Sequence, residues 1–288
     1  MDRLVRSGCE VIDNPYKRKL TKVELLNLLA NGVTGLIAGL EPLDRDVLTR
    51  STLQVISRCG AGLSNVDLKA AEDLGIKVRR TPDAPTSAVA ELTVGAMITL
   101  MRRVPQMDRD LHLGRWSKHV GVQLEGKTVL IIGFGRIGRK VAALVRPFEI
   151  KVLAVDPTLQ GTVDGVPVLT LDVALPQADV ICFHASCAEE ILGKHEFKLI
   201  KPGTFLLNAS RGELVNETCL CQALDCGVIA GAWLDTFVEE PYTGPLTQYH
   251  QVILTPHIGS SSIECRRRME MEAVENLLAA FEELSLVR

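Results

Sequence analysis

The sequence predicts an α/β protein with two doubly wound parallel-sheet domains. Helix-like and strand-like segments alternate from about residue 20 onward, the pattern of parallel sheets connected by helices. The strand-like segments are short, continuous apolar runs, as expected for strands that helices cover on both faces. The 288 residues are 47% hydrophobic and 23% charged, which suits two ordinary globular cores.

The first domain is expected over residues 1–103. Its expected elements are a helix over 20–29, strands over 35–38 and 53–56, a helix over 67–74, a strand over 76–78 and a long apolar helix over 87–103. Gly75 is expected to end the helix before it, because glycine readily adopts the left-handed conformation that closes many helices.

The second domain is expected over residues 104–262. Its clearest element is the strand 128–132, which stops at Gly133 and is followed by a helix over 137–145. Further strands are expected at 151–155, 180–183, 204–207, 230–234 and 252–254. A strongly helical tail over 264–286 is expected to pack back, so that residues 263–288 complete the first domain.

Charge and apolar patterning exclude two classes of partner. A formal net charge of −3 and a pI near 6.1 provide no global field for holding nucleic acid. The longest strongly apolar stretch, 92–101, is far shorter than the ~20 residues of a membrane span. The N-terminus is charged and interrupted by Asn14-Pro15, unlike a signal peptide. We therefore expect neither a nucleic-acid partner nor a membrane.

The eight cysteines predict reduced thiols and a cytoplasmic location. They include no CxxC pair and form no dense framework along this long chain. Cys219, Cys221 and Cys226 form the one cluster, on a helix-like stretch with no histidine nearby. We therefore expect no metal site.

A dinucleotide-binding turn is the sharpest local signal. Gly133, Gly135 and Gly138 form a GxGxxG motif that directly follows a buried strand and opens a helix. Gly133 allows the tight turn, Gly135 lets the backbone approach a pyrophosphate, and Gly138 lets the helix pack close to the strand. The N–H groups and positive dipole end of the helix then face the phosphates.

Asp156, at the end of the next strand, predicts NAD rather than NADP as the cofactor. Its carboxylate suits the adenosine ribose hydroxyls and repels a 2′-phosphate, and no Arg or Lys follows over 157–160. The alternative is a purely structural turn in which Asp156 caps a helix.

Three charged side chains, Arg211, Glu240 and His257, follow later strands. Ligands lie beyond the carboxyl ends of the strands in open α/β sheets, so we expect these loops to converge on the dinucleotide. The arginine can grip a substrate carboxylate, and the histidine can exchange a proton with a carbonyl or hydroxyl oxygen. The glutamate can orient the imidazole. Beside a nicotinamide, this trio predicts hydride transfer between 2-oxo and 2-hydroxy acids. Taken singly, each has an alternative as a surface charge or turn residue.

The chain resembles the D-isomer-specific 2-hydroxyacid dehydrogenase family, and its phosphoglycerate-dehydrogenase-like branch most closely. Six ordered motifs carry the resemblance: RCGAGLSNVD at 58–67, TPDAPTSAVAELT at 81–93, GKTVLIIGFGRIGR at 126–139, KPGTFLLNASRGELV at 201–215, LDTFVEEP at 234–241 and TPHIGSSS at 255–262. The resemblance implies a Rossmann NAD-binding domain and a smaller flavodoxin-like substrate domain.

The resemblance also implies roles for individual residues. It makes Arg211, Glu240 and His257 catalytic, with a small 2-oxo or 2-hydroxy acid as substrate. It implies cofactor contacts from Arg136 and Ile137 at the pyrophosphate, Asp235 at the nicotinamide carboxamide, and Ala209, Ser210, Gly259 and Ser260 along the nicotinamide side. It assigns the substrate carboxylate to backbone amides around Ala61 and Gly62, and a homodimer interface to 104–125.

The chain departs from the family pattern in three places. Only about nine residues precede the segment 10–12, so the substrate domain is expected to lack its first strand. His184-Ala-Ser-Cys187 lacks the proline that usually stands in that segment. Gly39 stands where phosphoglycerate dehydrogenases often carry an arginine, although Arg58 offers another phosphate contact.

Two further functions compete with the dehydrogenase. One is an NAD(H)-binding sensor or corepressor-like scaffold, or an inactive truncated form, which the short N-terminus favours. The retained trio argues against a pure sensor, because sensing does not need all three side chains. The other is a formate- or phosphite-type dehydrogenase, which keeps the hydride chemistry and changes the donor.

Overall fold

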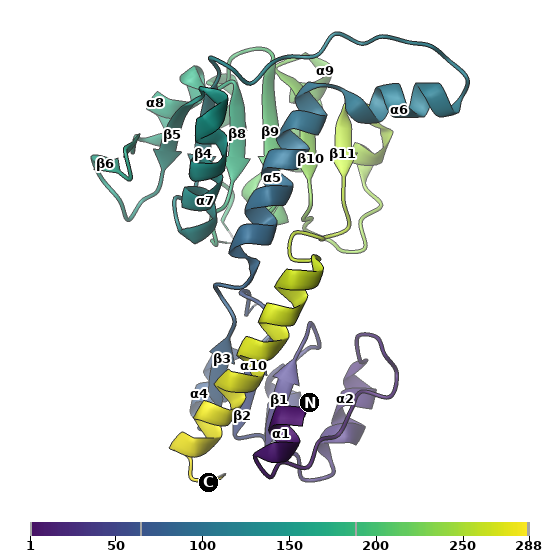
Figure 1. Ribbon diagram of the computed structural model, residues 1–288, viewed down its shortest axis with the longest axis vertical. Coiled ribbons are helices and arrows are strands. Elements are labelled where there is room, and N and C mark those ends of the chain that lie inside the picture. The colour runs from purple at the N-terminus through teal and green to yellow at the C-terminus, as the bar shows by residue number, and fades with distance from the viewer. Residues whose placement is uncertain (1, 64, 188, 287–288) are drawn as a thin grey trace. The chain divides into compact units, whose positions relative to one another are not determined.

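The computed structural model describes residues 2–63, 65–187 and 189–286, which fold into two compact units (Figure 1). Unit 1 comprises residues 1–85 and 261–288, and unit 2 comprises residues 86–260. The first boundary therefore lies at 85/86, where the sequence predicted 103/104. The reason is the long helix α5 (Pro85–Met101), whose Met97, Leu100 and Met101 are buried in a core cluster of unit 2.

Unit 1 contains a three-stranded parallel sheet in the order β1-β2-β3, with helices on both faces. The strands are β1 (Gly35–Ala38), β2 (Val55–Arg58) and β3 (Lys77–Arg80). On one face, α2 (Lys22–Leu29), α3 (Arg45–Thr49) and α4 (Leu68–Asp73) bury Leu25, Val47 and Ala70. On the other face, α1 (Asp2–Arg6) and α10 (Ile263–Glu283) bury Leu4 and Phe281, so the C-terminal helix completes unit 1 as predicted.

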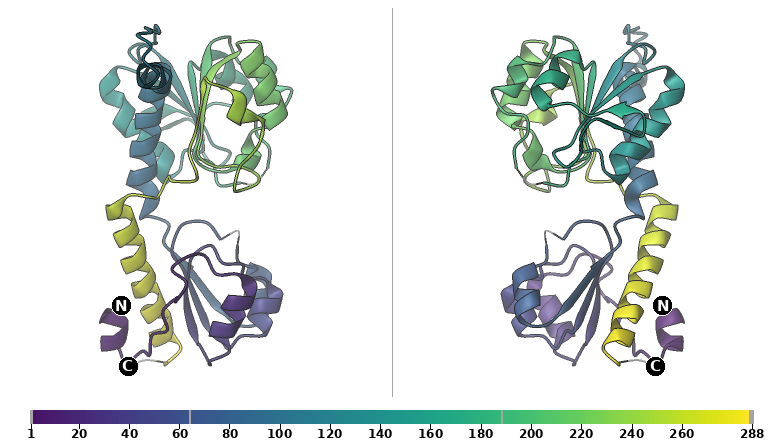
Figure 2. Two further views of the ribbon diagram at one scale, coloured as in Figure 1. Left: turned by 90° about the vertical axis from the view of Figure 1, so that its right-hand side faces the viewer. Right: turned by 90° about the vertical axis from the view of Figure 1, so that its left-hand side faces the viewer.

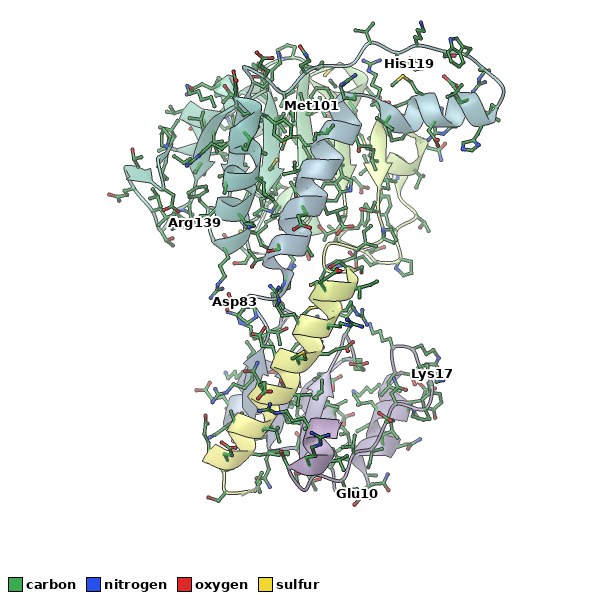
Figure 3. All side chains as sticks on the ribbon, in the orientation of Figure 1. Glu10, Lys17, Asp83, Met101, His119 and Arg139 are labelled. Atoms are coloured by element: carbon green, nitrogen blue, oxygen red, sulfur yellow. The ribbon has the colours of Figure 1, made fainter. Side chains whose placement is uncertain are left out.

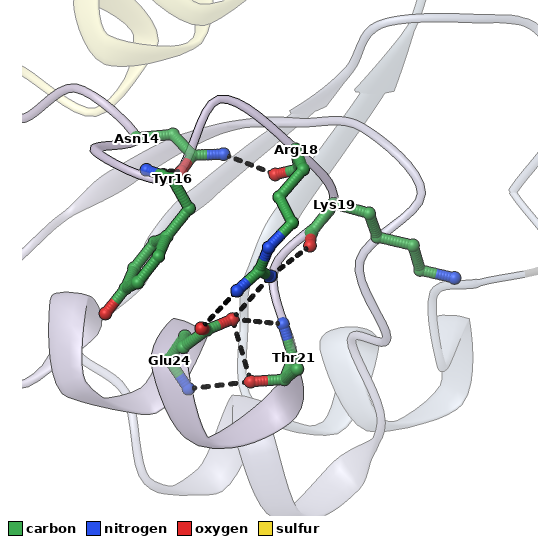
Figure 4. A network of polar contacts seen from close by, with 6 residues as sticks. All are labelled: Asn14, Tyr16, Arg18, Lys19, Thr21 and Glu24. Carbon is green, nitrogen blue, oxygen red and sulfur yellow. Dashed lines mark hydrogen bonds and ion pairs between the residues drawn. The ribbon is translucent and has the colours of Figure 1, made fainter.

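No strand forms among the described residues before Gly35, in agreement with the expected lack of a first strand. The stretch that leads into α2 is held instead by a polar network (Figure 4). Thr21 and Glu24 form a capping box at the start of α2, and Arg18 donates to Glu24 at 2.7 Å. The hydrogen bond from Arg18, with help from the Thr21 backbone, lowers the pKa of Glu24 to about 2.

Unit 2 contains a six-stranded parallel sheet in the order β11-β10-β9-β8-β4-β5. Its strands are β4 (Thr128–Ile132), β5 (Lys151–Val155), β8 (Val180–Phe183), β9 (Thr204–Asn208), β10 (Ile229–Leu234) and β11 (Val252–Leu254). All six lie where the sequence predicted strands. A separate two-stranded hairpin consists of β6 (Thr162–Val163) and β7 (Val166–Pro167).

Helices cover both faces of this sheet, as Figure 2 shows. Alternate strand residues divide between two core clusters, which is the signature of a sheet buried on both sides. One cluster holds α5 and α7 (Arg136–Val145), and the other holds α8 (Leu171–Ala174) and α9 (Glu217–Asp225). The remaining elements are α6 (Val104–His112) and five short 3-10 turns: η1 (Arg146–Phe148), η2 (Leu175–Gln177), η3 (Glu196–Lys198), η4 (Gly212–Leu214) and η5 (Pro245–Gln248).

The strand order creates a switch point between β4 and β8. The chain runs from β4 to β5 on one side and later returns to β8 on the other side of β4. In open α/β sheets this reversal leaves a crevice at the carboxyl ends of the strands, where ligands bind. Within the described ranges, no helix combines the length and apolar character needed to cross a membrane.

Candidate active site

The three motif glycines lie at the switch point, and the structure accounts for each of them in a different way. Gly133 has a φ of 91°, and a Cβ there would press on the backbone of His184 and Ala185. At Gly138 a Cβ would run into the carbonyl oxygen of Gly133. At Gly135 a Cβ would meet no protein atom within 4 Å. The fold itself therefore explains Gly133 and Gly138, and it leaves open space beside Gly135.

Helix α7 begins directly after Gly135, its N-cap residue, which supplies no side-chain cap. Arg136 and Ile137 lie in the first turn of the helix, which begins one residue before the predicted start at 137. Arg139, which is labelled in Figure 3, steadies the turn behind them, because its Nε donates to the carbonyl oxygen of Phe134 at 3.1 Å. An uncapped helix N-terminus beside open space fits an anion such as a pyrophosphate.

Asp156 closes the glycine turn from the end of β5. Its Oδ2 accepts a hydrogen bond from the Phe134 N–H at 2.9 Å, and its Oδ1 accepts from the Thr158 hydroxyl and N–H at 2.7 and 2.9 Å. Partial burial raises the pKa of Asp156, but these hydrogen bonds outweigh it and hold the pKa below its usual value. The carboxylate is therefore ionised at neutral pH. It holds the turn in shape, and it keeps lone pairs for further donors.

The loops that carry the predicted trio leave three neighbouring strands at one sheet edge. Leu234 pairs with both Asn208 and Leu254 in the parallel ladder, so β9, β10 and β11 end side by side. Their following loops contain Arg211, Glu240 and His257 respectively. The structure thus brings the three loops to the edge where the glycine turn also lies.

Arg211 is positioned by a residue that the sequence analysis did not single out. Asn208, fully buried at the end of β9, donates from Nδ2 to the Arg211 carbonyl oxygen at 2.7 Å. Its Oδ1 accepts from the Ser210 N–H at 3.1 Å. This local turn places Ala209 and Ser210 between the strand and the arginine. An asparagine at a strand end before Ala-Ser-Arg-Gly is the signal that could have revealed it.

Gly212 joins the arginine loop to the glutamate loop. A Cβ on Gly212 would overlap the backbone of Phe237 and Val238. Only glycine therefore allows the two loops to approach this closely. The sequence alone gave no signal for this contact, because it depends on two loops about 25 residues apart.

His257 and Glu240 form a hydrogen-bonded pair. The His257 Nδ1 lies 3.0 Å from Glu240 Oε2 and 3.2 Å from Oε1, and Oε1 also accepts from the Phe237 N–H at 3.1 Å. Both side chains keep substantial exposure, 47% for the histidine and 39% for the glutamate. The pair is therefore oriented and still open to a ligand, as an acid–base pair requires.

Asp235 holds the histidine loop. Its fully buried carboxylate accepts from the Thr255 hydroxyl at 2.6 Å and from the N–H groups of Ile258 and Gly259 at 2.8 Å each. His257 lies between these anchors with a φ of 54°, a left-handed conformation. The structure gives Asp235 this positioning task, and its predicted contact with a nicotinamide carboxamide stays a prediction. Gly259 and Ser260 follow directly in the same turn.

Ala61 and Gly62 belong to unit 1, in the loop after β2. The Ala61 carbonyl oxygen accepts a hydrogen bond from Arg80 Nη1 at 3.2 Å, and the Gly60 N–H donates to the Thr81 hydroxyl at 2.7 Å. These contacts order the loop within its own unit. The proposed role of its backbone amides toward a substrate remains a prediction.

His184, which follows β8, has two buried ring nitrogens. Neither nitrogen has a hydrogen-bond partner within the part of the chain that the structure describes. Burial lowers the pKa of His184 to about 4, so the ring is neutral at neutral pH. The described residues contain no group of three or more His, Cys, Asp or Glu side chains that could hold a metal ion.

We expect His184 to make the fold sensitive to mild acid. The unfolded chain binds a proton at this residue near pH 6.5, whereas the folded chain does so only near pH 4. The unfolded state therefore holds more protons between these values, and stability falls as the pH drops through this window. The wild type is expected to lose up to roughly 3 kcal/mol of its free energy of unfolding through this residue, and His184→Phe is expected to abolish that loss. Urea unfolding at pH 7 and pH 4.5 measures it, and equal pH dependence in both proteins would contradict the assignment.

Comparison with known proteins identifies the family of the chain. The family model for the D-isomer specific 2-hydroxyacid dehydrogenase NAD binding domain matches residues 94–259, most of unit 2. A glyoxylate reductase of Thermofilum pendens is 32% identical over 293 residues, covering 96% of this chain and 86% of the relative. The human D-3-phosphoglycerate dehydrogenase is 36% identical over 271 residues, covering 91% of this chain and 50% of the relative.

The solved structures give the same result. A glyoxylate reductase from Paecilomyes thermophila superimposes with a TM-score of 0.84 at 28% identity, covering 92% of this chain and 87% of that one. The chain spans about half the length of the phosphoglycerate dehydrogenases it matches. The chain spans most of the length of the two glyoxylate reductases. The family model matches most of unit 2, and the alignment with the glyoxylate reductases covers most of their length. The chain therefore belongs to the D-isomer specific 2-hydroxyacid dehydrogenase family.

Proposed function

We propose that this chain is an NAD-dependent D-2-hydroxyacid dehydrogenase, similar to phosphoglycerate dehydrogenase, that interconverts a small 2-hydroxy acid and its 2-oxo acid. The observation that carries the proposal is the His257–Glu240 pair, which shares a sheet edge with the Arg211 loop and the glycine turn. An acid–base pair, a carboxylate-binding cation and a dinucleotide site are the parts that this reaction requires.

The dinucleotide fits the residues that are present. Gly135 leaves space for a pyrophosphate, the uncapped start of α7 offers N–H donors, and the ionised Asp156 offers acceptors for ribose hydroxyls. We propose further contacts from Arg136, Ile137, Ala209 and Ser210, and from Asp235, Gly259 and Ser260. When bound, the nicotinamide ring supplies the hydride donor or acceptor.

The chain's own side chains supply binding and proton transfer. Arg211 binds the substrate carboxylate through parallel N–H···O bonds. Because Nδ1 of His257 faces Glu240, its Nε2 exchanges the proton with the oxygen on the substrate's second carbon. Glu240 fixes the tautomer and stabilises the positive charge that the ring carries between transfers.

The test of this function is an NADH-oxidation screen over 2-oxo acids, run beside an NADH-binding titration. The screen includes 3-phosphohydroxypyruvate, hydroxypyruvate and glyoxylate. Fast turnover of one acid is expected and identifies the substrate. Tight NADH binding with no turnover of any acid would overturn the proposal in favour of a sensor or an inactive form.

We expect NADH to bind at least about tenfold more tightly than NADPH, a difference of about 1.4 kcal/mol. The reason is that the ionised Asp156 carboxylate at the end of β5 would lie against a 2′-phosphate. Asp156→Ser keeps a small acceptor for the turn and removes the charge. The difference in affinity between NADH and NADPH should therefore become smaller. Fluorescence titration of both proteins with both dinucleotides measures it. A wild-type preference for NADPH would contradict the role of Asp156.

We also propose that the protein is a homodimer joined through residues 104–125 and works in the cytoplasm. Support for the dimer comes from α6 and the segment after it, which expose large apolar side chains: Leu111, Leu113, Trp116 and Val120. Trp116 is 80% exposed and Val120 is 89% exposed. Support for the cytoplasm is the cysteine pattern of the sequence.

Trp116→Glu combined with Val120→Glu is expected to weaken the dimer at least about 100-fold, because each change places a charge in the proposed apolar contact. Because both side chains are exposed in the single chain, the two substitutions should leave the fold of the chain unaffected. Val23→Glu is the matched control, as Val23 is 68% exposed on α2. Light scattering across a concentration series measures the dimer. A double variant with the dissociation constant of the wild type would exclude this surface.

A further inference from the structure

Tyr242 anchors the loop that carries Glu240, and the proposed reaction does not otherwise use it. Its ring stacks on Phe237, with centroids 4.2 Å apart and planes at 18°. Its hydroxyl donates to Glu217 Oε2 at 2.8 Å and accepts from the Leu246 N–H at 3.1 Å. Gly244 lets the loop fold over the ring, since a Cβ there would overlap the Tyr242 side chain.

These contacts lead directly to the acid–base pair. The N–H of Phe237, the residue under the Tyr242 ring, donates to Glu240 Oε1 at 3.1 Å. Glu217 lies in the first turn of α9, which begins just beyond the Arg211 loop. One hydroxyl thus ties the glutamate loop to the helix that follows the arginine loop, in addition to the close approach at Gly212.

Tyr242 is well suited to this task. Burial, and then its hydrogen bond to Glu217, raise the pKa of the hydroxyl above its usual value, so it remains a donor at every physiological pH. Glu240 is partly exposed, and water competes there for its carboxylate. The hydrogen bond between Glu240 and His257 therefore depends on how firmly the surrounding loop is held.

We propose that Tyr242, through its hydrogen bond to Glu217, is a positioning residue that holds Glu240 against Nδ1 of His257. Its effect on turnover rests on the proposed function, whereas its effect on the histidine does not. Without the tether the loop between β10 and β11 has more freedom, and the carboxylate spends less time at hydrogen-bond distance from the ring. The imidazole then samples both tautomers.

The experiment compares Tyr242→Phe with Glu217→Ala in the full-length chain. Each is expected to lower kcat about tenfold with little change in the KM for NADH, because only the acid–base geometry is disturbed. The double variant is expected to be no worse than either single variant, since both remove one shared hydrogen bond. Tyr249→Phe is the matched control, because that hydroxyl interacts with Asp225 instead of Glu217.

A second readout is independent of catalysis. In protein labelled with 15N-histidine, His257 is expected to show the Nδ1-protonated tautomer in the wild type and in Tyr249→Phe. Both tether variants should move its 15N shifts toward a mixture of tautomers, and the spectrum of His257→Asn assigns the signal. Thermal unfolding confirms that each variant is folded at the assay temperature.

The outcomes separate the two proposals. Wild-type 15N shifts in the folded tether variants would overturn the positioning role, as would additive losses in the double variant. If the wild type turns over no 2-oxo acid, the proposed function fails, and the 15N shifts still decide whether Tyr242 positions the pair.

Discussion

His257→Asn is expected to lower kcat by about 10³-fold while NADH affinity stays within about twofold of the wild type. The variant removes Nε2, the atom that we propose exchanges a proton with the substrate oxygen, and it leaves the glycine turn at the other strands intact. Asparagine is the informative replacement, because His257 has a φ of 54° and asparagine tolerates this left-handed conformation better than alanine does.

Steady-state kinetics on the acid identified by the screen, together with an NADH titration, measure this effect. Glu240→Gln is the companion variant: it keeps a hydrogen-bond acceptor and removes the charge, so a smaller loss of about tenfold to 100-fold is expected. Normal turnover by His257→Asn would exclude the histidine as the acid–base group. Loss of NADH binding in the same variant would instead show that the histidine loop supports the fold.

The strands and the trio could be predicted because their signals are local. Each strand of unit 2 is a continuous apolar run, and in a doubly wound sheet every such run ends at the same edge. Polar residues that directly follow the runs are therefore neighbours in space. This reasoning predicted that Arg211, Glu240 and His257 follow strands that end at one edge, and the structure shows the hydrogen bond between Glu240 and His257.

The domain boundary could not be read in the same way. The helix predicted over 87–103 is apolar on most sides, so its pattern does not indicate which core it enters. The structure places α5 against the sheet of unit 2, and this moves the boundary to 85/86. Only tertiary packing decides between two available cores.

Two positioning residues were beyond the sequence signal. Gly212 lies between loops that become neighbours only after the sheet forms, and Tyr242 contacts a helix that begins 25 residues earlier. Asn208 differs, because it bonds within its own turn. Asp235 was selected for a cofactor contact, yet its buried carboxylate holds the turn around His257. Residue type predicts which groups do chemistry, whereas the groups that position them follow from contacts.

Gly135→Ala is expected to weaken NADH binding about 100-fold, roughly 2.7 kcal/mol, and to lower the stability of the cofactor-free protein by no more than about 1 kcal/mol. Gly135 has a φ of −81°, which alanine adopts without strain, and the added Cβ would meet no protein atom within 4 Å. Apart from the modest preference of a helix N-cap for glycine over alanine, nothing within the protein requires a glycine at this position. A pyrophosphate that approaches the start of α7 would meet the new methyl group.

Gly133→Ala is the matched comparison, because the fold itself requires a glycine at position 133. Its φ is 91°, and the new Cβ would collide with the backbone after β8, so the fold itself should lose about 2–4 kcal/mol. Both variants are measured by thermal unfolding without cofactor and by NADH titration. The two measurements distinguish a glycine that the fold requires from a glycine that the dinucleotide requires. If Gly135→Ala binds NADH like the wild type, the turn is merely a strand-to-helix connection. If it loses binding with only a small change in stability, the space beside Gly135 exists for the dinucleotide, since no contact within the chain requires it.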